Sequence, residues 1–259
     1  MLFTTKIFHE NSKEWVVFVH GAGGSSAVWH KQVKPFSEKF NVLLVDLRGH
    51  GQSKLKSESK KYSFKMIAND VLETLKAHSI ETAHFVGVSL GSIIIKQVYS
   101  LQPKIVKSMV FAGAVTELNF KSRLLLRIGR IFNSVLPYMV LYKIFARVMM
   151  PKKNHERSRK LFIQEAKKLM DNEFKRWFKL TARLTAYLSE LEKDKSIIPK
   201  LYIMGGEDHL FLAPVKKIVA NDSYSQLQIV PNSGHVVNID NHLLFNELSI
   251  DFIEKQSID

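Results

Sequence analysis

The chain has 259 residues, of which 46% are hydrophobic and none is cysteine; this suits one globular domain and excludes disulfides and thiolate chemistry. The formal net charge is +14, and residues 119–195 carry most of it, with 19 Lys or Arg against 7 Asp or Glu. No stretch reaches the roughly 18 apolar residues of a membrane span, and residues 1–15 lack the apolar core of a secretory signal. We therefore expect a soluble, cytoplasmic protein.

Short apolar runs alternate with helical patterns on both sides of residues 119–195. The expected helices cover 63–78, 92–101 and 242–255, with Ser63 as a candidate N-cap. The expected strands are rich in β-branched and aromatic side chains and cover 15–19, 42–45, 83–88, 106–112, 200–204 and 227–230. This alternation is typical of βαβ units, so we predict a doubly wound, mostly parallel sheet with helices on both faces.

Residues 119–195 interrupt the alternation. They contain no convincing strand, and Pro137 and Pro151 punctuate them. We predict an inserted helical segment of about four helices, which leaves 1–118 and 196–259 as the α/β core.

The strongest chemical signal is Gly87-Val-Ser89-Leu-Gly91, which follows an expected strand and opens an expected helix. This is the context of a nucleophile elbow, in which a serine sits on a strained turn. Its neighbours two residues away must be small, and glycine supplies that. Such a pattern arises by chance in roughly one chain in ten of this length, so an idle serine in a tight turn is the alternative. The context makes Ser89 the candidate nucleophile.

A serine hydroxyl needs an adjacent base to attack at neutral pH. His235 lies just after the last expected strand and Asp208 just after the preceding one. The order Ser, acid, His along the chain matches that of nucleophile-elbow enzymes. Glu117, after the 106–112 strand, is the alternative acid. Two neighbours of Asp208, Glu207 and His209, are expected to point away from it.

Acyl transfer also needs hydrogen-bond donors for the developing oxyanion. The backbone N–H of Leu90 follows the nucleophile, and the glycine-rich run His20-Gly-Ala22-Gly-Gly follows an early strand. We predict the N–H groups of Ala22 and Leu90 as these donors. His20 is interpreted as fixing its loop, and the loop between Asp46 and Ser53 as structural.

Five blocks, HGAGGSSAVW, DLRGHGQS, GVSLGS, GGEDHLF and SGHVVNID, together closely resemble the α/β-hydrolase superfamily, above all its small bacterial esterases, lipases and peroxidase-like members. The resemblance covers 1–118 and 196–259, and 119–195 corresponds to a cap domain by position alone. It implies the α/β-hydrolase fold and hydrolysis of ester, thioester or amide bonds through an acyl-enzyme, without cofactor or metal ion. Ser89 would attack, His235 would shuttle the proton and Asp208 would orient the imidazole. We predict a serine esterase acting on a small-molecule acyl ester, such as a lipid.

Three other functions remain open. A lyase or carbon–carbon hydrolase of the same fold could act on an anionic substrate held by arginines of the cap, such as Arg123, Arg127 and Arg130. A binding protein without turnover would not need all three candidate catalytic residues. Dinucleotide binding at the glycine-rich run is disfavoured because Ser26 stands where glycine or alanine is required.

The expected cap is rich in large apolar residues and in cations. We predict that Leu124, Ile128 and Phe132 line an apolar acyl pocket, with Arg123 and Arg127 at its rim; the alternative is that the apolar residues only pack the cap onto the core.

The basic segment could also associate peripherally with the anionic inner face of a membrane, the alternative being a solvated helical surface. Nucleic acid is not expected, because no aromatic stacking platform accompanies the charge. Acyl length, leaving group and oligomeric state remain open.

Overall fold

One seven-stranded sheet organises the chain. The computed structural model describes residues 1–53, 61–132, 135–193 and 196–257, and within these the strand order is β1-β3-β2-β4-β5-β6-β7. Strand β1 is antiparallel to β3, and every other neighbouring pair is parallel. The strands are β1 (Thr4–Ile7), β2 (Trp15–Val19), β3 (Asn41–Val45), β4 (Ala83–Val88), β5 (Val106–Ala112), β6 (Lys200–Gly205) and β7 (Ser225–Val230).

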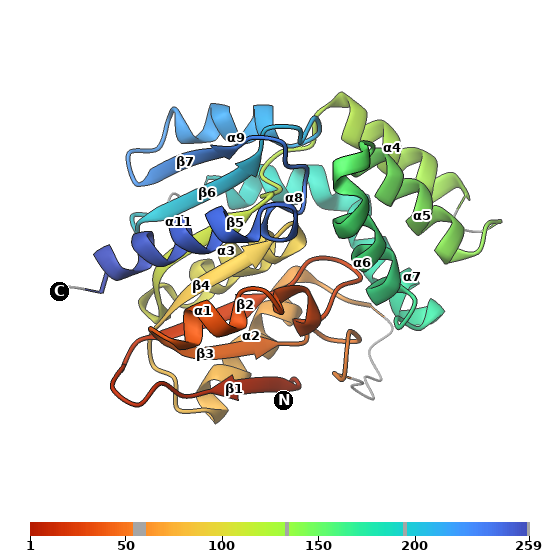
Figure 1. Cartoon of the computed structure of the whole chain (residues 1–259). Helices are drawn as coiled ribbons and strands as arrows, with labels where there is room; N and C mark the ends of the chain where they lie inside the picture. Colours follow the sequence, from red (N-terminus) through yellow and green to blue (C-terminus); the bar gives the residue numbers. More distant parts are fainter. Residues whose placement is uncertain (54–60, 133–134, 194–195, 258–259) are drawn as a thin grey trace.

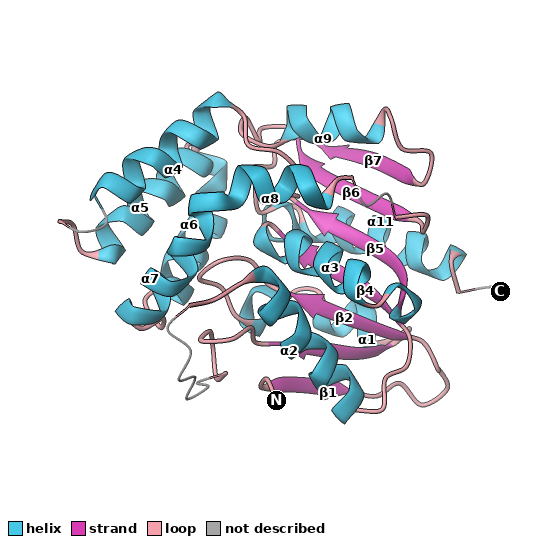
Figure 2. Ribbon diagram, turned by 180° about the vertical axis from the view of Figure 1, so that it is seen from behind, coloured by secondary structure: helices cyan, strands magenta, loops and turns pink. Residues whose placement is uncertain are grey.

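Helices cover both faces of this sheet (Figures 1 and 2). Side chains alternate along each strand, so in β2 Val17 and Val19 enter one apolar cluster while Val16 and Phe18 enter the other. The first cluster packs under α2 (Phe64–Ala77), α3 (Leu90–Leu101) and α9 (Leu212–Val219), and the second under α1 (Val33–Ser37), α10 (Val237–Asp240) and α11 (His242–Lys255). The predicted doubly wound α/β-hydrolase fold is confirmed.

Most of the helices that the chain forms between β5 and β6 lie beyond one end of the sheet, and the last of them packs beside α3 on one face of the sheet (Figures 1 and 2). Its described residues contain five α-helices rather than the expected four, and no strand. They are α4 (Phe120–Phe132), α5 (Tyr138–Met149), α6 (Glu156–Ala166), α7 (Asp171–Leu180) and α8 (Leu184–Leu191). None of the helices described in the chain has both the length and the hydropathy needed to cross a membrane.

Most element boundaries follow the sequence pattern. Three strands have the predicted bounds, and Ser63 caps α2 by accepting a hydrogen bond from the N–H of Met66 at 3.1 Å. Strand β1 was not predicted. Its sequence, TTKI, is short and only partly buried, and its pairing with β3 at the sheet edge, rather than local hydropathy, holds it in place.

Candidate active site

Ser89 lies on a strained turn between β4 and α3. Its φ of 53° and ψ of −116° fall in a region that non-glycine residues rarely adopt. The two flanking glycines are sterically required, because a Cβ at Gly91 would overlap the carbonyl oxygen of Val19 and one at Gly87 would lie 2.5 Å from the side chain of Ile95. The spacing that singled out Ser89 therefore has a steric cause in the fold.

The structure brings Ser89, His235 and Asp208 into one hydrogen-bonded series. The Ser89 hydroxyl lies 2.9 Å from Nε2 of His235, and Nδ1 of the same ring lies 2.8 Å from Oδ2 of Asp208. Both the imidazole and the carboxylate are almost completely buried. Glu117, the alternative acid, does not join the series; its carboxylate is half exposed and lies 3.8 Å from the ammonium of Lys217.

Asp208 is held in its charged form. Burial by itself raises the pKa of Asp208, but the attraction and hydrogen bond of His235, with the N–H groups of Phe211 and Leu210, outweigh burial and hold that pKa below its ordinary value. These amides donate to Oδ1 at 3.1 and 3.2 Å. Because a charged carboxylate only accepts, it fixes the ring proton on Nδ1 and leaves Nε2 free to accept from Ser89.

Ala22 and Leu90, the residues predicted to supply the oxyanion donors, line the same cavity as Ser89. Leu90 is the first residue of α3 and Ala22 lies in the loop after β2; both line the cavity. Neither N–H donates to another described residue, whereas their neighbours are satisfied: the N–H of Gly23 donates to Nε2 of His50 at 2.9 Å. The Ala22 carbonyl accepts from the Tyr142 hydroxyl of α5 at 2.7 Å. Both predicted residues thus lie at the cavity that Ser89 lines, and their role as oxyanion donors stays a prediction.

His20 and His50 fix the loop that carries Ala22. Nδ1 of His20 donates to the carbonyl of Gly21 at 2.7 Å, and Nε2 accepts from the N–H of Leu47 at 2.9 Å. Burial lowers the pKa of His20, and burial together with His20 lowers the pKa of His50 to about 3. Both rings are therefore neutral at physiological pH, which agrees with a structural role for them.

The cavity in front of Ser89 has a volume of about 180 Å³ and an apolar wall. Its described lining contains no charged side chain, and the hydroxyls of Ser122, Tyr142 and Thr181 donate to backbone carbonyls. The wall brings together aliphatic and aromatic side chains from both core and inserted helices, among them Ile93, Leu125, Leu126, Phe145, Met149, Phe174, Phe178 and Phe211. Among the described lining residues, the Ser89 hydroxyl and the N–H groups of Ala22 and Leu90 are thus the polar groups available to a ligand in an otherwise apolar cavity.

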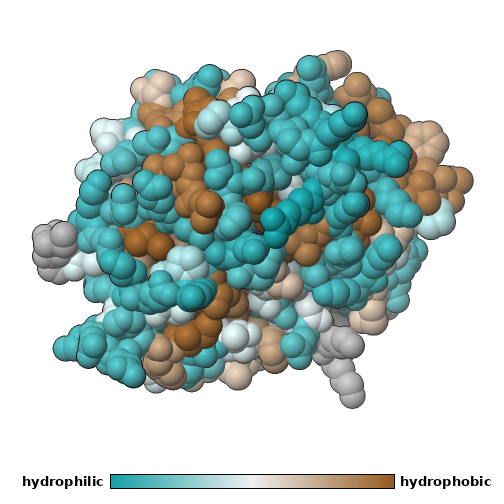
Figure 3. Space-filling view, viewed as in Figure 1, coloured by the Kyte–Doolittle hydropathy of each residue, from teal (hydrophilic) through white to brown (hydrophobic). Residues whose placement is uncertain are grey.

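The predicted pocket residues on α4 were wrong. Leu124, Ile128 and Phe132 are 43–45% exposed, and Arg123 and Arg127 are also at the surface. Their neighbours Ser122, Leu125 and Leu126 line the cavity instead. Both sides of α4 carry apolar residues, so periodicity alone did not identify the inner one. Figure 3 shows hydrophobic side chains at the edge of the molecule where Figure 1 places α4 and α5.

Glu207 ties the loop after β6 to the inserted helices. Its carboxylate lies 2.8 Å from Nζ of Lys152, 2.9 Å from Nδ2 of Asn154 and 2.7 Å from Nε2 of His155. The hydrogen bonds from Lys152 and Asn154 lower the pKa of Glu207 to about 2. Glu207 therefore bonds to residues outside the Ser89–His235–Asp208 series, and His209 is exposed. No local motif predicts these links, because the partners lie more than 50 residues apart along the chain.

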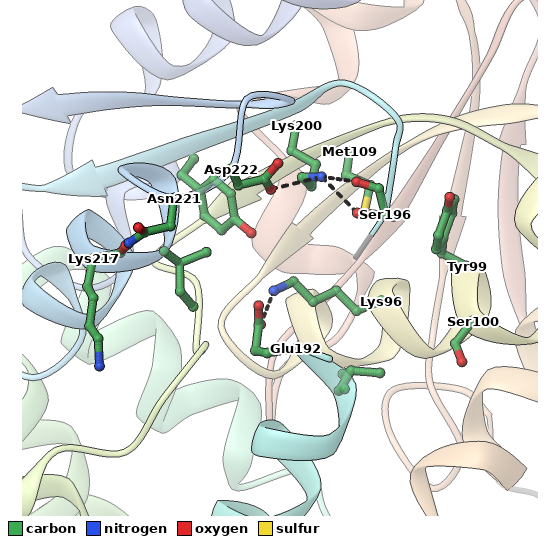
Figure 4. Close-up of a pocket in the computed structure, with 13 residues that line it drawn as sticks. Lys96, Tyr99, Ser100, Met109, Glu192, Ser196, Lys200, Lys217, Asn221 and Asp222 are labelled. Atoms are coloured by element: carbon green, nitrogen blue, oxygen red, sulfur yellow. Dashed lines mark hydrogen bonds and ion pairs between the residues drawn. The ribbon is translucent and has the colours of Figure 1, made fainter. Parts of the chain in front are cut away.

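A second cavity, of about 220 Å³, lies near the opposite ends of β5 and β6 (Figure 4). Four of its ionic groups form two pairs: Lys96 pairs with Glu192, and Nζ of Lys200 lies 3.0 Å from Asp222 and 2.6 Å from the carbonyl of Ser196. Lys217, which also lines it, lies 3.8 Å from Glu117 outside the lining. It contains none of the predicted site residues. In the described part of the chain, no three acidic or histidine side chains are grouped as metal ligands.

Comparisons with known proteins found hydrolases that are similar to parts of this chain. The (E)-2-((N-methylformamido)methylene)succinate hydrolase of Acinetobacter baylyi is 31% identical over 113 residues, which are 43% of this chain and 42% of that protein. The pimeloyl-[acyl-carrier protein] methyl ester esterase of Aeromonas hydrophila is 35% identical over 95 residues, 37% of this chain and 35% of the esterase. Each match thus spans less than half of the curated relative.

The likeness in structure extends over the whole chain. The enol-lactonase from Burkholderia xenovorans LB400 superposes with a TM-score of 0.84 at 17% identity, covering 98% of this chain and 96% of the lactonase. The model of the alpha/beta hydrolase fold family matches residues 14–242, which include Ser89, Asp208 and His235. This chain therefore belongs to the α/β hydrolase fold family.

Proposed function

We propose that the protein is a serine hydrolase that cleaves carboxylic esters of apolar acyl groups through an acyl-enzyme intermediate. The observation that carries the proposal is the hydrogen-bonded series Ser89–His235–Asp208 opening into an apolar cavity. The named activity of the Aeromonas hydrophila relative, a methyl ester esterase, supports the same class of bond.

The geometry accounts for each step of that reaction. The Ser89 oxygen attacks the ester carbonyl while its proton passes to Nε2 of His235, and the Asp208 carboxylate stabilises the imidazolium. The carbonyl oxygen becomes an oxyanion facing the N–H groups of Ala22 and Leu90. His235 then protonates the departing alcohol, and a water activated by the same imidazole hydrolyses the acyl-enzyme. The chain's own residues supply every group, so we propose no cofactor.

We propose that residues 119–195 act as a cap on the core formed by 1–118 and 196–259, with the cavity wall of α4, α5 and α7 holding the acyl group. The arginines invoked for a lyase or carbon–carbon hydrolase, Arg123 and Arg127, lie outside the cavity. The described lining of the cavity therefore offers no cationic side chain to bind an anionic substrate.

We further propose a cytoplasmic location, with peripheral association at the inner membrane face through the basic segment 119–195.

The acyl preference can be tested with nitrophenyl esters of increasing chain length. Each methylene buried against the apolar wall is worth about 0.8 kcal/mol, so kcat/KM should rise up to about fourfold per methylene until the cavity is full. Leu125→Trp, which fills the cavity, should move the optimum to shorter esters. Leu124→Trp, one residue away but outward-facing, is the matched control and should leave it unchanged. A kcat/KM that does not depend on acyl chain length, or an equal shift of the chain-length optimum in both variants, would contradict the assigned acyl pocket.

Tyr142 is proposed as a positioning residue for the oxyanion donors. Its hydroxyl bonds the Ala22 carbonyl, and a Cβ on Gly23 would lie 2.7 Å from its ring, so ring and loop are in close contact. We expect Tyr142→Phe to lower kcat about tenfold with little change in KM, because the amide of Ala22 is less well aimed at the transition state.

The matched control is Tyr138→Phe. Tyr138 is also on α5, and its hydroxyl donates to the carbonyl of Leu169 at 2.8 Å, away from Ala22. Both variants lose one hydrogen bond to a backbone carbonyl, so both should lose similar thermal stability. A kcat that falls equally in the two variants would show that Tyr142 has only a structural role.

A further inference from the structure

The outer side of α4 exposes large apolar side chains, which together with the exposed Val135 after the helix are termed here the outer α4 face. It consists of Phe120, Leu124, Ile128, Ile131, Phe132 and Val135. Phe120 and Val135 are the most exposed, at 73% and 77%. Phe120, Leu124, Ile128 and Ile131 recur at intervals of three and four, which places them on one side of α4. Figure 3 shows hydrophobic side chains gathered at this edge of the molecule.

The exposed cations of α4 and α5 have no acidic neighbours in sequence. Residues 119–155 contain eight Lys or Arg and no Asp or Glu. Six of the eight are exposed on α4 and α5 and form no ion pair with another described residue: Lys121, Arg123, Arg127, Arg130, Lys143 and Arg147. An apolar stripe beside unpaired cations complements a surface that is apolar inside and negatively charged outside.

The inner side of the same helix lines the cavity in front of Ser89, through Ser122, Leu125 and Leu126. A single helix, α4, thus separates the outer α4 face from the cavity in front of Ser89. An apolar molecule leaving a lipid phase at the outer α4 face needs to pass only this helix to reach Ser89.

We propose that the outer α4 face docks on an anionic phospholipid bilayer, with its apolar side chains among the acyl chains and the six cations on the headgroups. Resting on the proposed esterase function, the structure also assigns the source of the substrate: an acyl ester dissolved in that bilayer, which enters beside α4. A second copy of the chain is a poorer occupant, because a two-fold contact would bring the same unpaired cations together.

Binding of the full chain to vesicles tests the docking separately from catalysis. Sedimentation with vesicles of phosphatidylcholine alone should leave the chain in solution, and added phosphatidylglycerol should bind it in a salt-sensitive way. Arg123→Glu and Arg127→Glu should each weaken binding at least about fivefold. Phe120→Ser and Val135→Ser should weaken it as well, because they remove the most exposed apolar side chains.

Three controls make the result specific. Leu243→Ser and Lys104→Glu change an exposed apolar and an exposed basic residue outside residues 119–155 and should leave vesicle binding unchanged. Ser89→Ala should also bind normally, so docking can hold even if the esterase proposal fails. The four surface variants should hydrolyse soluble nitrophenyl esters at the wild-type rate. No binding to phosphatidylglycerol, equal binding by all variants, or a dimer that only Phe120→Ser dissolves would overturn the proposal; the last outcome would assign the face to a second copy.

Discussion

Replacing Ser89 with alanine should lower esterase kcat by a factor on the order of 10⁴ or more. The Ser89 hydroxyl lies within hydrogen-bond reach of His235 in front of the cavity, and the other hydroxyls that line the cavity donate to backbone carbonyls. Without it, the base has no alcohol to activate. The measurement is steady-state hydrolysis of a nitrophenyl ester, with thermal unfolding to show that the variant folds.

Ser122→Ala is the matched control for this variant. Ser122 lines the same cavity, but its hydroxyl donates to the carbonyl of Asn119 at 3.0 Å. It should retain most of the wild-type activity. An Ser89→Ala chain that stays within about tenfold of wild type would assign the chemistry to another group.

Asp208→Asn should reduce kcat by about 10³- to 10⁴-fold. An asparagine amide can donate a hydrogen bond to Nδ1 of His235, and the ring proton then sits on Nε2. A protonated Nε2 can no longer accept the hydrogen bond from the Ser89 hydroxyl. The variant also removes the negative charge that stabilises the imidazolium. Since the pKa of Asp208 is held below its ordinary value, the wild-type carboxylate stays charged through the neutral and mildly acidic range.

Glu117→Gln distinguishes the two candidate acids. Glu117 is exposed and lies near Lys217, so its substitution should leave kcat close to wild type. Measuring both variants with the same ester between mildly acidic and mildly alkaline pH gives a direct comparison. Loss of activity in Glu117→Gln with activity kept in Asp208→Asn would reverse the assignment.

The placement of the site residues was predictable because it depends on sheet topology. Ser89, Asp208 and His235 each follow a parallel strand, and the carboxyl ends of parallel strands meet at one edge of the sheet. Short glycine-flanked motifs mark these strand ends in the sequence. The sequence therefore predicts that these three side chains lie close together in the fold.

The cavity wall was not predictable in the same way. Helix α4 carries apolar residues on opposite sides, so its hydropathy pattern fits two orientations. Packing selects one of them: a Cβ at Gly129 would lie 2.6 Å from the ring of Phe145 and 3.0 Å from that of Phe178. The small residues Ser122 and Gly129 are the buried ones on α4, and they were the available signal for its inner side. The bond between Tyr142 and Ala22 joins residues 120 positions apart and has no local signature.

We propose that the buried His235–Asp208 pair makes Ser89 an active nucleophile. A fluorophosphonate probe followed by peptide mass mapping measures this property without knowledge of the substrate. We predict stoichiometric labelling of Ser89 in the wild type and in Ser122→Ala, with none in Ser89→Ala. A folded wild-type chain that resists the probe, or one labelled at another residue to the same extent after Ser89→Ala, would contradict the claim.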